Sequence, residues 1–265
     1  MAMRFSILGS GSSGNAAFLQ TDGCRILIDA GFSARRLETM LAAIGESLGA
    51  IDAVFLTHEH GDHAAGLTGL KRHPHLKLFA NRDTAESIQR GLAHKPDWQI
   101  FETGSRFRYR DLEIEAFSVP HDACDPVGFV FTNGADDLFS PRRRLGWLTD
   151  LGHLPPHVRE RVREVDYLVI EANHDTALLD ADRKRPWPVK QRICGRHGHL
   201  SNQATCEYLA SEASPGWREV YLAHMSRDCN SLEAIGREFA AFVAGGRFAL
   251  SPVPAGAGTA PRDLV

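Results

Sequence analysis

The sequence predicts an α/β sandwich, in which two β-rich sheets pack together and helices cover their outer faces. Three observations lead to this prediction. Strand and helix patterns alternate in the first third of the chain, the middle is rich in strand patterns, and alternation returns in the last third. The chain has 265 residues, of which 43% are hydrophobic, so it has enough apolar residues for a large core.

Composition excludes several classes of protein. The apolar share and a formal net charge of −3 exclude disorder of the whole chain. No apolar run approaches the roughly 20 residues that cross a bilayer, and the start lacks the pattern of a signal peptide. We therefore expect a cytoplasmic protein that does not associate with membranes. The near-neutral charge disfavours broad coating of nucleic acid but allows a local basic groove.

Strands are expected where apolar residues alternate with polar ones or run continuously. Their predicted ranges are 4–8, 16–20, 25–29, 51–57, 76–80, 106–109, 112–119, 127–132, 145–149, 167–171, 219–223 and 247–250.

Helices are expected where a capping residue or a proline precedes a pattern of period 3.6. Their predicted ranges are 33–44, which Gly45 ends, a loop and helix up to 73, then 83–92, 155–164, 201–213 and 232–244. We expect residues 1–250 to form one domain, and the Pro-, Gly- and Ala-rich residues 251–265 to form a flexible tail.

The strongest functional signal is a run of histidine and acidic residues directly after a predicted buried strand. The run is Thr57-His58-Glu59-His60-Gly61-Asp62-His63. Because side chains two apart on an extended chain share one face, His58 and His60 can point at one metal ion. Gly61 can supply a turn that brings Asp62 and His63 to a second ion. Imidazole and carboxylate groups suit zinc and similar ions, so we predict a metal site rather than a solvated loop.

Four ligands on one loop cannot fill the coordination of two metal ions, so further ligands are expected at other strand ends. His121, Asp150 and His224 each follow a predicted strand, and a carboxylate can bridge two cations. Each of the three could also be an ordinary residue, but their common placement favours a metal role. Asp29, at the end of another strand, is expected to orient the ligand loop rather than to bind metal.

The HxHxDH run, followed by a distant His, an Asp and a His, resembles the metallo-β-lactamase superfamily over residues of about 3–250. This resemblance implies an αββα sandwich, with two mixed β-sheets flanked by helices. It implies two divalent metal ions, Zn²⁺ or Mn²⁺. The implied ligands are His58, His60 and His121 for one ion, Asp62, His63 and His224 for the other, and Asp150 as the bridge.

Later motifs narrow the resemblance to one branch. They are Glu171-Ala172-Asn173-His174-Asp175, Gly198-His199-Leu200-Ser201-Asn202 and Leu222-Ala223-His224-Met225-Ser226. Together they resemble the phosphodiesterase branch that includes ribonuclease Z. With Pro188-Val189-Lys190 and Asn230, the sequence most resembles YycJ/WalJ-type bacterial proteins, regarded as 5′-to-3′ double-stranded DNA exonucleases. A DNA substrate is implied by this resemblance alone.

Candidates for phosphate contacts come from a glycine–serine loop and from these motifs. The loop at residues 9–15 can present backbone N–H groups to an anion, or be a plain turn. The candidates are Ser12, Ser13, Asn15, Ser201, Asn202, Ser226 and Asn230. A basic group before His199 could line a phosphate groove or form a solvated face. Its members are Arg183, Arg185, Lys190, Arg192 and Arg196.

The catalytic candidates are Asp62, His199 and Glu171. The resemblance implies that His199 acts near the leaving group and that Glu171 occupies the matching acidic position. A neighbouring carboxylate would orient His199 and raise its pKa, which favours a proton donor. Alternatively, His199 merely precedes the helix that Ser201 caps. No physical role is apparent for His174.

The sequence therefore predicts metal-dependent phosphodiester hydrolysis, with a nucleic acid as the partner. Two cations would lower the pKa of a bound water toward 7, and His199 would protonate the departing oxygen. Two alternatives stay open. One is a hydrolase of a thioester, lactone or cyclic phosphodiester, since the same metal set serves these reactions. The other is a metal-stabilised binding protein, which seven ligands disfavour because structural zinc usually takes four.

Overall fold

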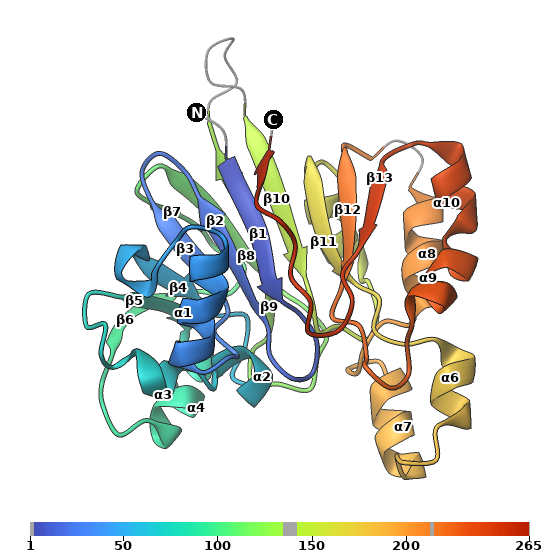
Figure 1. Cartoon of the computed structure of the whole chain (residues 1–265), viewed down its shortest axis with the longest axis horizontal. Helices are drawn as coiled ribbons and strands as arrows, with labels where there is room; N and C mark the ends of the chain where they lie inside the picture. The colour runs from blue at the N-terminus through green and yellow to red at the C-terminus, as the bar shows by residue number, and fades with distance from the viewer. Residues whose placement is uncertain (1–2, 135–141, 213–214, 265) are drawn as a thin grey trace.

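The structure is a computed structural model that describes residues 3–134, 142–212 and 215–264. Within these residues the chain forms two seven-stranded sheets that pack face to face, with helices on both outer sides (Figure 1). Both sheets mix parallel and antiparallel neighbours, so the predicted αββα sandwich is confirmed.

The first sheet has the strand order β14-β1-β2-β3-β4-β5-β6. The pairs from β14 to β3 are antiparallel and those from β3 to β6 are parallel. The strands are β1 (Met3–Gly9), β2 (Ala16–Gln20), β3 (Arg25–Ile28), β4 (Ala53–Phe55), β5 (Lys77–Asn81), β6 (Asp97–Phe101) and β14 (Arg262–Leu264).

The second sheet has the order β13-β12-β11-β10-β9-β8-β7. Its pairs from β7 to β10 are antiparallel and those from β10 to β13 are parallel. The strands are β7 (Arg106–Tyr109), β8 (Leu112–Ser118), β9 (Val127–Asn133), β10 (Arg143–Leu148), β11 (Tyr167–Glu171), β12 (Glu219–Ala223) and β13 (Ala249–Pro252). In each sheet one strand, β3 or β10, stands where antiparallel pairing changes to parallel.

Helices connect the parallel strands and cover the sheets. They are α1 (Ala34–Ala43), a 3₁₀ turn (Leu48–Ala50), α2 (Gly61–Ala64), α3 (Leu67–Leu70), α4 (Arg82–Gly91), α5 (Pro156–Val162), α6 (Thr176–Ala181), α7 (Trp187–Cys194), α8 (Asn202–Ser211), α9 (Leu232–Glu238) and α10 (Ala240–Gly245). The predicted caps Ser33, Ser201 and Ser231 all accept a hydrogen bond from the first turn of their helix. No helix among the described residues is both long and apolar enough to cross a membrane.

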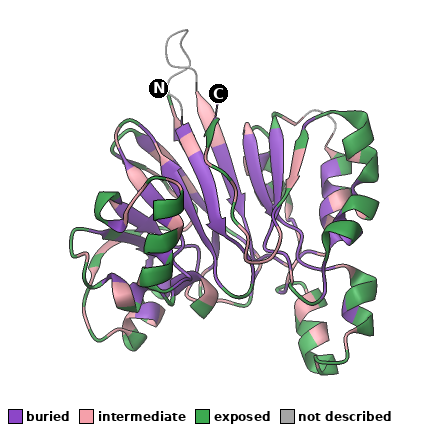
Figure 2. Ribbon diagram, in the orientation of Figure 1, coloured by how far each residue is buried: buried purple, intermediate pink, exposed green. Residues whose placement is uncertain are grey.

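Three apolar clusters build the layers. One lies between the sheets, and the other two lie between each sheet and its helices, so the central strands are buried on both faces (Figure 2). The edge strands β6, β7, β13 and β14 are partly exposed. Phe55 joins the sheets because its ring stacks on Phe79 of the first sheet, at 4.4 Å between centroids, and meets Phe131 of the second edge-on at 5.7 Å. This burial explains why a short strand such as β4 forms.

The predicted flexible tail at residues 251–265 is corrected by the structure. After β13 the chain crosses to the first sheet, where β14 pairs with β1 and Leu264 is fully buried. Between them, the hydroxyl of Thr259 accepts a hydrogen bond from the Ile7 backbone N–H at 3.0 Å. Without β14, the backbone N–H and C=O groups along this edge of β1 would be unpaired. Because β14 is far from β1 in the sequence, no local sequence pattern predicts this pairing.

Other differences from the predicted elements are also local. The strand β6 and the helices α6 and α7 lie outside the predicted ranges, because they are short, at five, six and eight residues, and α7 contains a proline in its first turn. The single helix predicted over 232–244 is two helices, which meet at the non-helical Phe239.

We predict that Thr259→Val lowers the free energy of unfolding by about 1–3 kcal/mol, because it leaves the Ile7 N–H without an acceptor. Urea denaturation measures the change. Thr39→Val, on the exposed face of α1, is the matched control and should change stability much less. Equal stabilities of the two variants would show that the C-terminal crossing adds nothing.

Candidate metal centre

The HxHxDH loop leaves the buried strand β4 and turns into α2. His60 stands just before α2, and its carbonyl accepts the N–H groups of His63 and Ala64 at 2.9 and 3.0 Å. This single turn places Asp62 and His63 on the side of the loop opposite to the approaching strand. Gly31 allows the loop to pack closely, since a Cβ atom there would lie only 1.7 Å from the Asp62 carbonyl oxygen.

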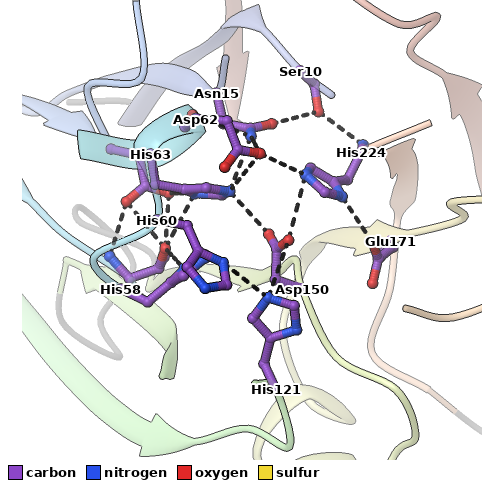
Figure 3. Close-up of polar contacts among 12 residues, drawn as sticks. Ser10, Asn15, His58, His60, Asp62, His63, His121, Asp150, Glu171 and His224 are labelled. Carbon is purple, nitrogen blue, oxygen red and sulfur yellow. Dashed lines mark hydrogen bonds and ion pairs between the residues drawn. The ribbon is translucent and has the colours of Figure 1, made fainter. Parts of the chain in front are cut away.

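The three distant ligand candidates meet this loop. His121 Nε2 lies 3.3 Å from His60 Nδ1, and His224 Nε2 lies 3.7 Å from Asp62 Oδ2. Asp150 lies between the two groups, with one oxygen 3.1 Å from His63 Nε2 and the other 3.4 Å from His224 Nε2 (Figure 3). Among the described residues, four groups have ligand atoms close enough to share an ion: His58, His60 and His121; His58, His63 and Asp150; Asp62, His63 and His224; and Asp150, Glu171, His199 and His224. We call the seven predicted ligands the metal centre.

Three residues at the site have a left-handed backbone. Asp29 and Asp150 both have φ of 60°, and His224 has φ of 53°. Each directly follows a strand or lies one residue beyond it, so the reversed turn sends the side chain inward rather than along the sheet. Such a conformation costs a non-glycine residue about 1–3 kcal/mol and persists only where the surroundings enforce it.

Three histidines of the metal centre have their Nδ1 atom in a hydrogen bond with a neighbouring residue. Each hydrogen bond fixes the ring so that Nε2 points at the centre. His63 Nδ1 lies 2.8 Å from Asp29 Oδ2, and His224 Nδ1 lies 2.8 Å from Glu171 Oε1. The carbonyl oxygen of Gly198 is 3.1 Å from His121 Nδ1. As expected, Asp29 thus supports the ligand loop, and it also accepts the backbone N–H of Thr57 at 2.8 Å. Contacts of this kind fix the tautomer that binds a metal through Nε2.

Buried atoms without partners test whether this group suits a divalent cation. His58 Nε2, His224 Nε2 and Asp150 Oδ2 are buried, and none has a hydrogen-bond partner among the described residues. A buried polar atom without a partner is costly, whereas divalent cations bound at the centre would satisfy these atoms. Together with the convergent imidazoles and carboxylates, this makes the centre compatible with divalent metal ions.

Burial and opposite charges compete in setting the protonation of the site. Burial would raise the pKa of Asp150, but His224 and His63 outweigh it and hold this pKa well below its usual value. Burial lowers the pKa of His58, and the neighbouring His63 lowers it further. Asp150 is therefore anionic and His58 is neutral, which are the forms that bind metal. Burial lowers the pKa of His63 and of His224, but Asp150 outweighs it, raising the first well above its usual value and the second to about 10, so these two imidazoles must lose a proton when metal binds.

His199 and Glu171 form the pair that the sequence predicts. His199 Nδ1 is 2.8 Å from Glu171 Oε1, and the other Glu171 oxygen accepts the backbone N–H of Leu151 at 3.1 Å. Burial lowers the pKa of His199, but the carboxylates of Glu171 and Asp150 outweigh it, so the pKa lies above its usual value. Burial would raise the pKa of Glu171, yet His199 and His224 bring it to about 2. His199 can therefore hold a proton beside the metal centre.

Four of the predicted phosphate contacts have side chains that hydrogen-bond within the fold. Asn15 accepts the Gly11 N–H at 2.8 Å, and Ser201 caps α8. Asn202 and Asn230 are buried and pair with each other at 2.8 and 2.9 Å. These partners are distant in sequence, so the motif alone cannot distinguish a structural amide from a substrate contact.

The other three candidates stay accessible. Ser12 and Ser226 line the pocket at the metal centre, while Ser13 is exposed and lies 3.4 Å from Arg227. The glycine–serine loop has a role that sequence reasoning missed. Ser10 Oγ accepts the His224 N–H at 2.8 Å, so the loop joins the first sheet to a ligand of the second (Figure 3).

The pocket has a volume of about 240 Å³ and extends from the metal centre to the helices α6 and α7. On that side it is lined by Leu179, Arg185, Val189, Arg192 and Ile193. Arg185 and Arg192 belong to the basic group that was identified in the sequence. His174 also lines it, but burial lowers its pKa to about 4 and Cys194 Sγ lies 3.8 Å from its Nε2. It is thus a neutral wall residue.

Known proteins are similar to this chain in sequence and in fold. A family model described as a beta-lactamase superfamily domain matches residues 24–225. The exodeoxyribonuclease YycJ of Bacillus anthracis is 32% identical over 235 residues, which cover 88% of this chain and 86% of that protein. The exodeoxyribonuclease WalJ of Streptococcus pneumoniae is 34% identical over 237 residues, covering 88% and 85%.

Solved structures agree on the architecture. The metallo-β-lactamase fold protein YhfI from Bacillus subtilis superposes with a TM-score of 0.71 over 98% of this chain and 100% of that one, at 17% identity. At this identity the likeness concerns the fold alone. The family model and the relatives YycJ and WalJ, in contrast, match this chain in sequence. They show that this chain belongs to the metallo-β-lactamase superfamily of hydrolases.

Proposed function

We propose that this chain is a phosphodiesterase that uses two divalent metal ions, and that it degrades double-stranded DNA from the 5′ end. The observation that carries the proposal is the meeting of seven candidate metal ligands with the His199–Glu171 pair at one pocket, whose wall includes His60, Asp62, His121, Asp150, His199 and His224. The two exodeoxyribonuclease relatives support DNA as the substrate.

His58, His60 and His121 would hold one ion, Asp62, His63 and His224 the other, and Asp150 would bridge them. When bound, two such ions lower the pKa of a water ligand toward neutrality and neutralise charge on a phosphate group. Asp29, Gly198 and Glu171 restrain the rings of His63, His121 and His224, so these imidazoles are oriented to bind the ions.

The departing oxygen of a phosphodiester needs a proton, and His199 is the group that can deliver it. Its Nδ1 is held by Glu171, so the proton on Nε2 is the one to transfer. The negative charge of Glu171 stabilises the imidazolium before the transfer. Ser12 and Ser226, on the pocket wall, are the remaining candidates to contact phosphate oxygens.

The first test is activity. With Mn²⁺ or Zn²⁺, the purified protein should release nucleotides from a duplex labelled at its 5′ end, and Asp62→Ala should abolish the release. Failure on duplex DNA, single strands, RNA and bis(p-nitrophenyl) phosphate would contradict the proposal. Turnover of a thioester or lactone without any phosphodiester would favour the small-molecule alternative.

The second test concerns metal. We predict two divalent ions per chain by elemental analysis of the purified protein, and loss of at least one in Asp150→Ala. Asp29→Asn should weaken metal affinity about 10- to 100-fold, because it disturbs the group that orients His63. Asp83→Asn, on the exposed first turn of α4, is the control. An unchanged affinity in Asp29→Asn would refute its orienting role.

The third test isolates the proton donor. His199→Ala should lower kcat on DNA about 100- to 10,000-fold with unchanged metal content. The loss should be smaller with bis(p-nitrophenyl) phosphate, since p-nitrophenolate departs without a proton. His75→Ala, at an exposed position, serves as the control. Equal losses on both substrates would rule out proton donation and indicate a purely structural role.

A further inference from the structure

One segment beside the metal centre has an unusual charge. Residues 183–196 contain six lysine and arginine residues, and no acidic residue follows them until Glu207, although the whole chain has a net charge of −3. The segment follows α6 and includes α7, and we call residues Thr176–Cys194, which span both helices, the helical arm. A concentration of positive charge next to the pocket favours a polyanion as its partner.

The arm exposes apolar side chains that folding does not use. Trp187 is 65% exposed, whereas Trp147 and Trp217 are buried. Leu178 and Val189 are 39% and 40% exposed, and α7 has no buried residue. Leu179 is the buried residue of α6, so few apolar contacts attach the arm to the body, and Figure 2 shows its surface mostly exposed. Such exposure is typical of a contact surface.

The arm is nevertheless held in position. Arg185 binds Asp182 at 2.7 Å and Asp228 at 3.1 Å, and Arg192 forms an ion pair with Asp122, which follows the metal-ligand candidate His121. Prolines on both sides of Trp187 restrict the backbone where α7 begins. Figure 1 shows the two helices standing beside the loop end of the sheets. The exposed indole is therefore held in a restricted position on an arm whose residues Arg185, Val189 and Arg192 line the pocket.

We propose that the helical arm binds the unpaired end of the DNA strand that enters the metal centre, with Trp187 stacking on a base and the basic residues contacting phosphates. This inference rests on the proposed function and adds the element that recognises the substrate. An exposed aromatic ring among cations is the arrangement that binds single-stranded nucleic acid without regard to sequence. Arg185, Val189 and Arg192 of the arm line one side of the pocket at the metal centre, so a strand end that enters the pocket passes the arm.

Binding is measured by fluorescence anisotropy with a labelled 20-nucleotide single strand and Mn²⁺, in a His199→Ala background that slows cleavage. Trp187→Ala should weaken binding about 5- to 150-fold, which is the usual effect of removing one stacking contact. Val243→Ala, at a residue 71% exposed on α10, is the matched control and should bind as the parent does. Equal affinity of Trp187→Ala and the control would overturn stacking by Trp187.

A second variant tests the charges. Arg183 is exposed, so Arg183→Gln should leave the fold unchanged. If Arg183 contacts a phosphate, its removal reduces the slope of log Kd against log salt concentration by about 0.7, the value expected for one contact to a single strand. Arg35→Gln on α1 is the control and should keep the slope. An unchanged slope in Arg183→Gln together with unchanged affinity in Trp187→Ala would refute the arm as a DNA-binding element.

The outcomes separate this inference from the proposed function. Binding that depends on the arm, without cleavage by the protein that retains His199, would support the arm and contradict the nuclease activity. Cleavage with full affinity in both arm variants would support the nuclease and refute the arm. Absence of DNA binding by the parent protein would overturn both.

Discussion

The carboxylate of Asp150 is the group on which the site depends, because it is buried where the two sheets meet. Its oxygens contact His63, which follows a strand of the first sheet, and His224, which follows a strand of the second. Removing a carboxylate from water costs several kcal/mol unless cations or hydrogen bonds compensate. The surrounding histidines, and the metal ions that they suit, provide this compensation. The sandwich must therefore close in the register that brings both histidines to one acidic group.

The sheets supply that register through equivalent strand ends. Asp29 follows β3 and Asp150 follows β10, and these are the strands where antiparallel pairing changes to parallel in each sheet. Both residues adopt a left-handed backbone, and a change of strand direction opens space at a sheet edge where side chains can converge. The carboxylate of Asp29 orients His63, and the carboxylate of Asp150 contacts both His63 and His224. Beside this rigid edge, the helical arm provides a surface with few core contacts.

Features that depend on residues close together in the sequence could be predicted, whereas features that depend on contacts between distant residues could not. The strand that ends before His58 has a local apolar pattern, and the ends of strands before Asp150 and His224 could be located in the same way. The seven ligand candidates could therefore be identified from the sequence alone. The pairing of Asn202 with Asn230 and of Thr259 with β1 joins residues far apart in sequence, and no local pattern reveals it. For the same reason, the arm appeared in the sequence only as a group of charges.

Anomalous diffraction from crystals grown with Zn²⁺ or Mn²⁺ would test the metal centre most directly. Two peaks should appear, both beside Asp150, with His58, His60 and His121 around one and Asp62, His63 and His224 around the other. Peaks remote from Asp150, or a protein that takes up neither ion with these residues intact, would contradict the role given to this carboxylate.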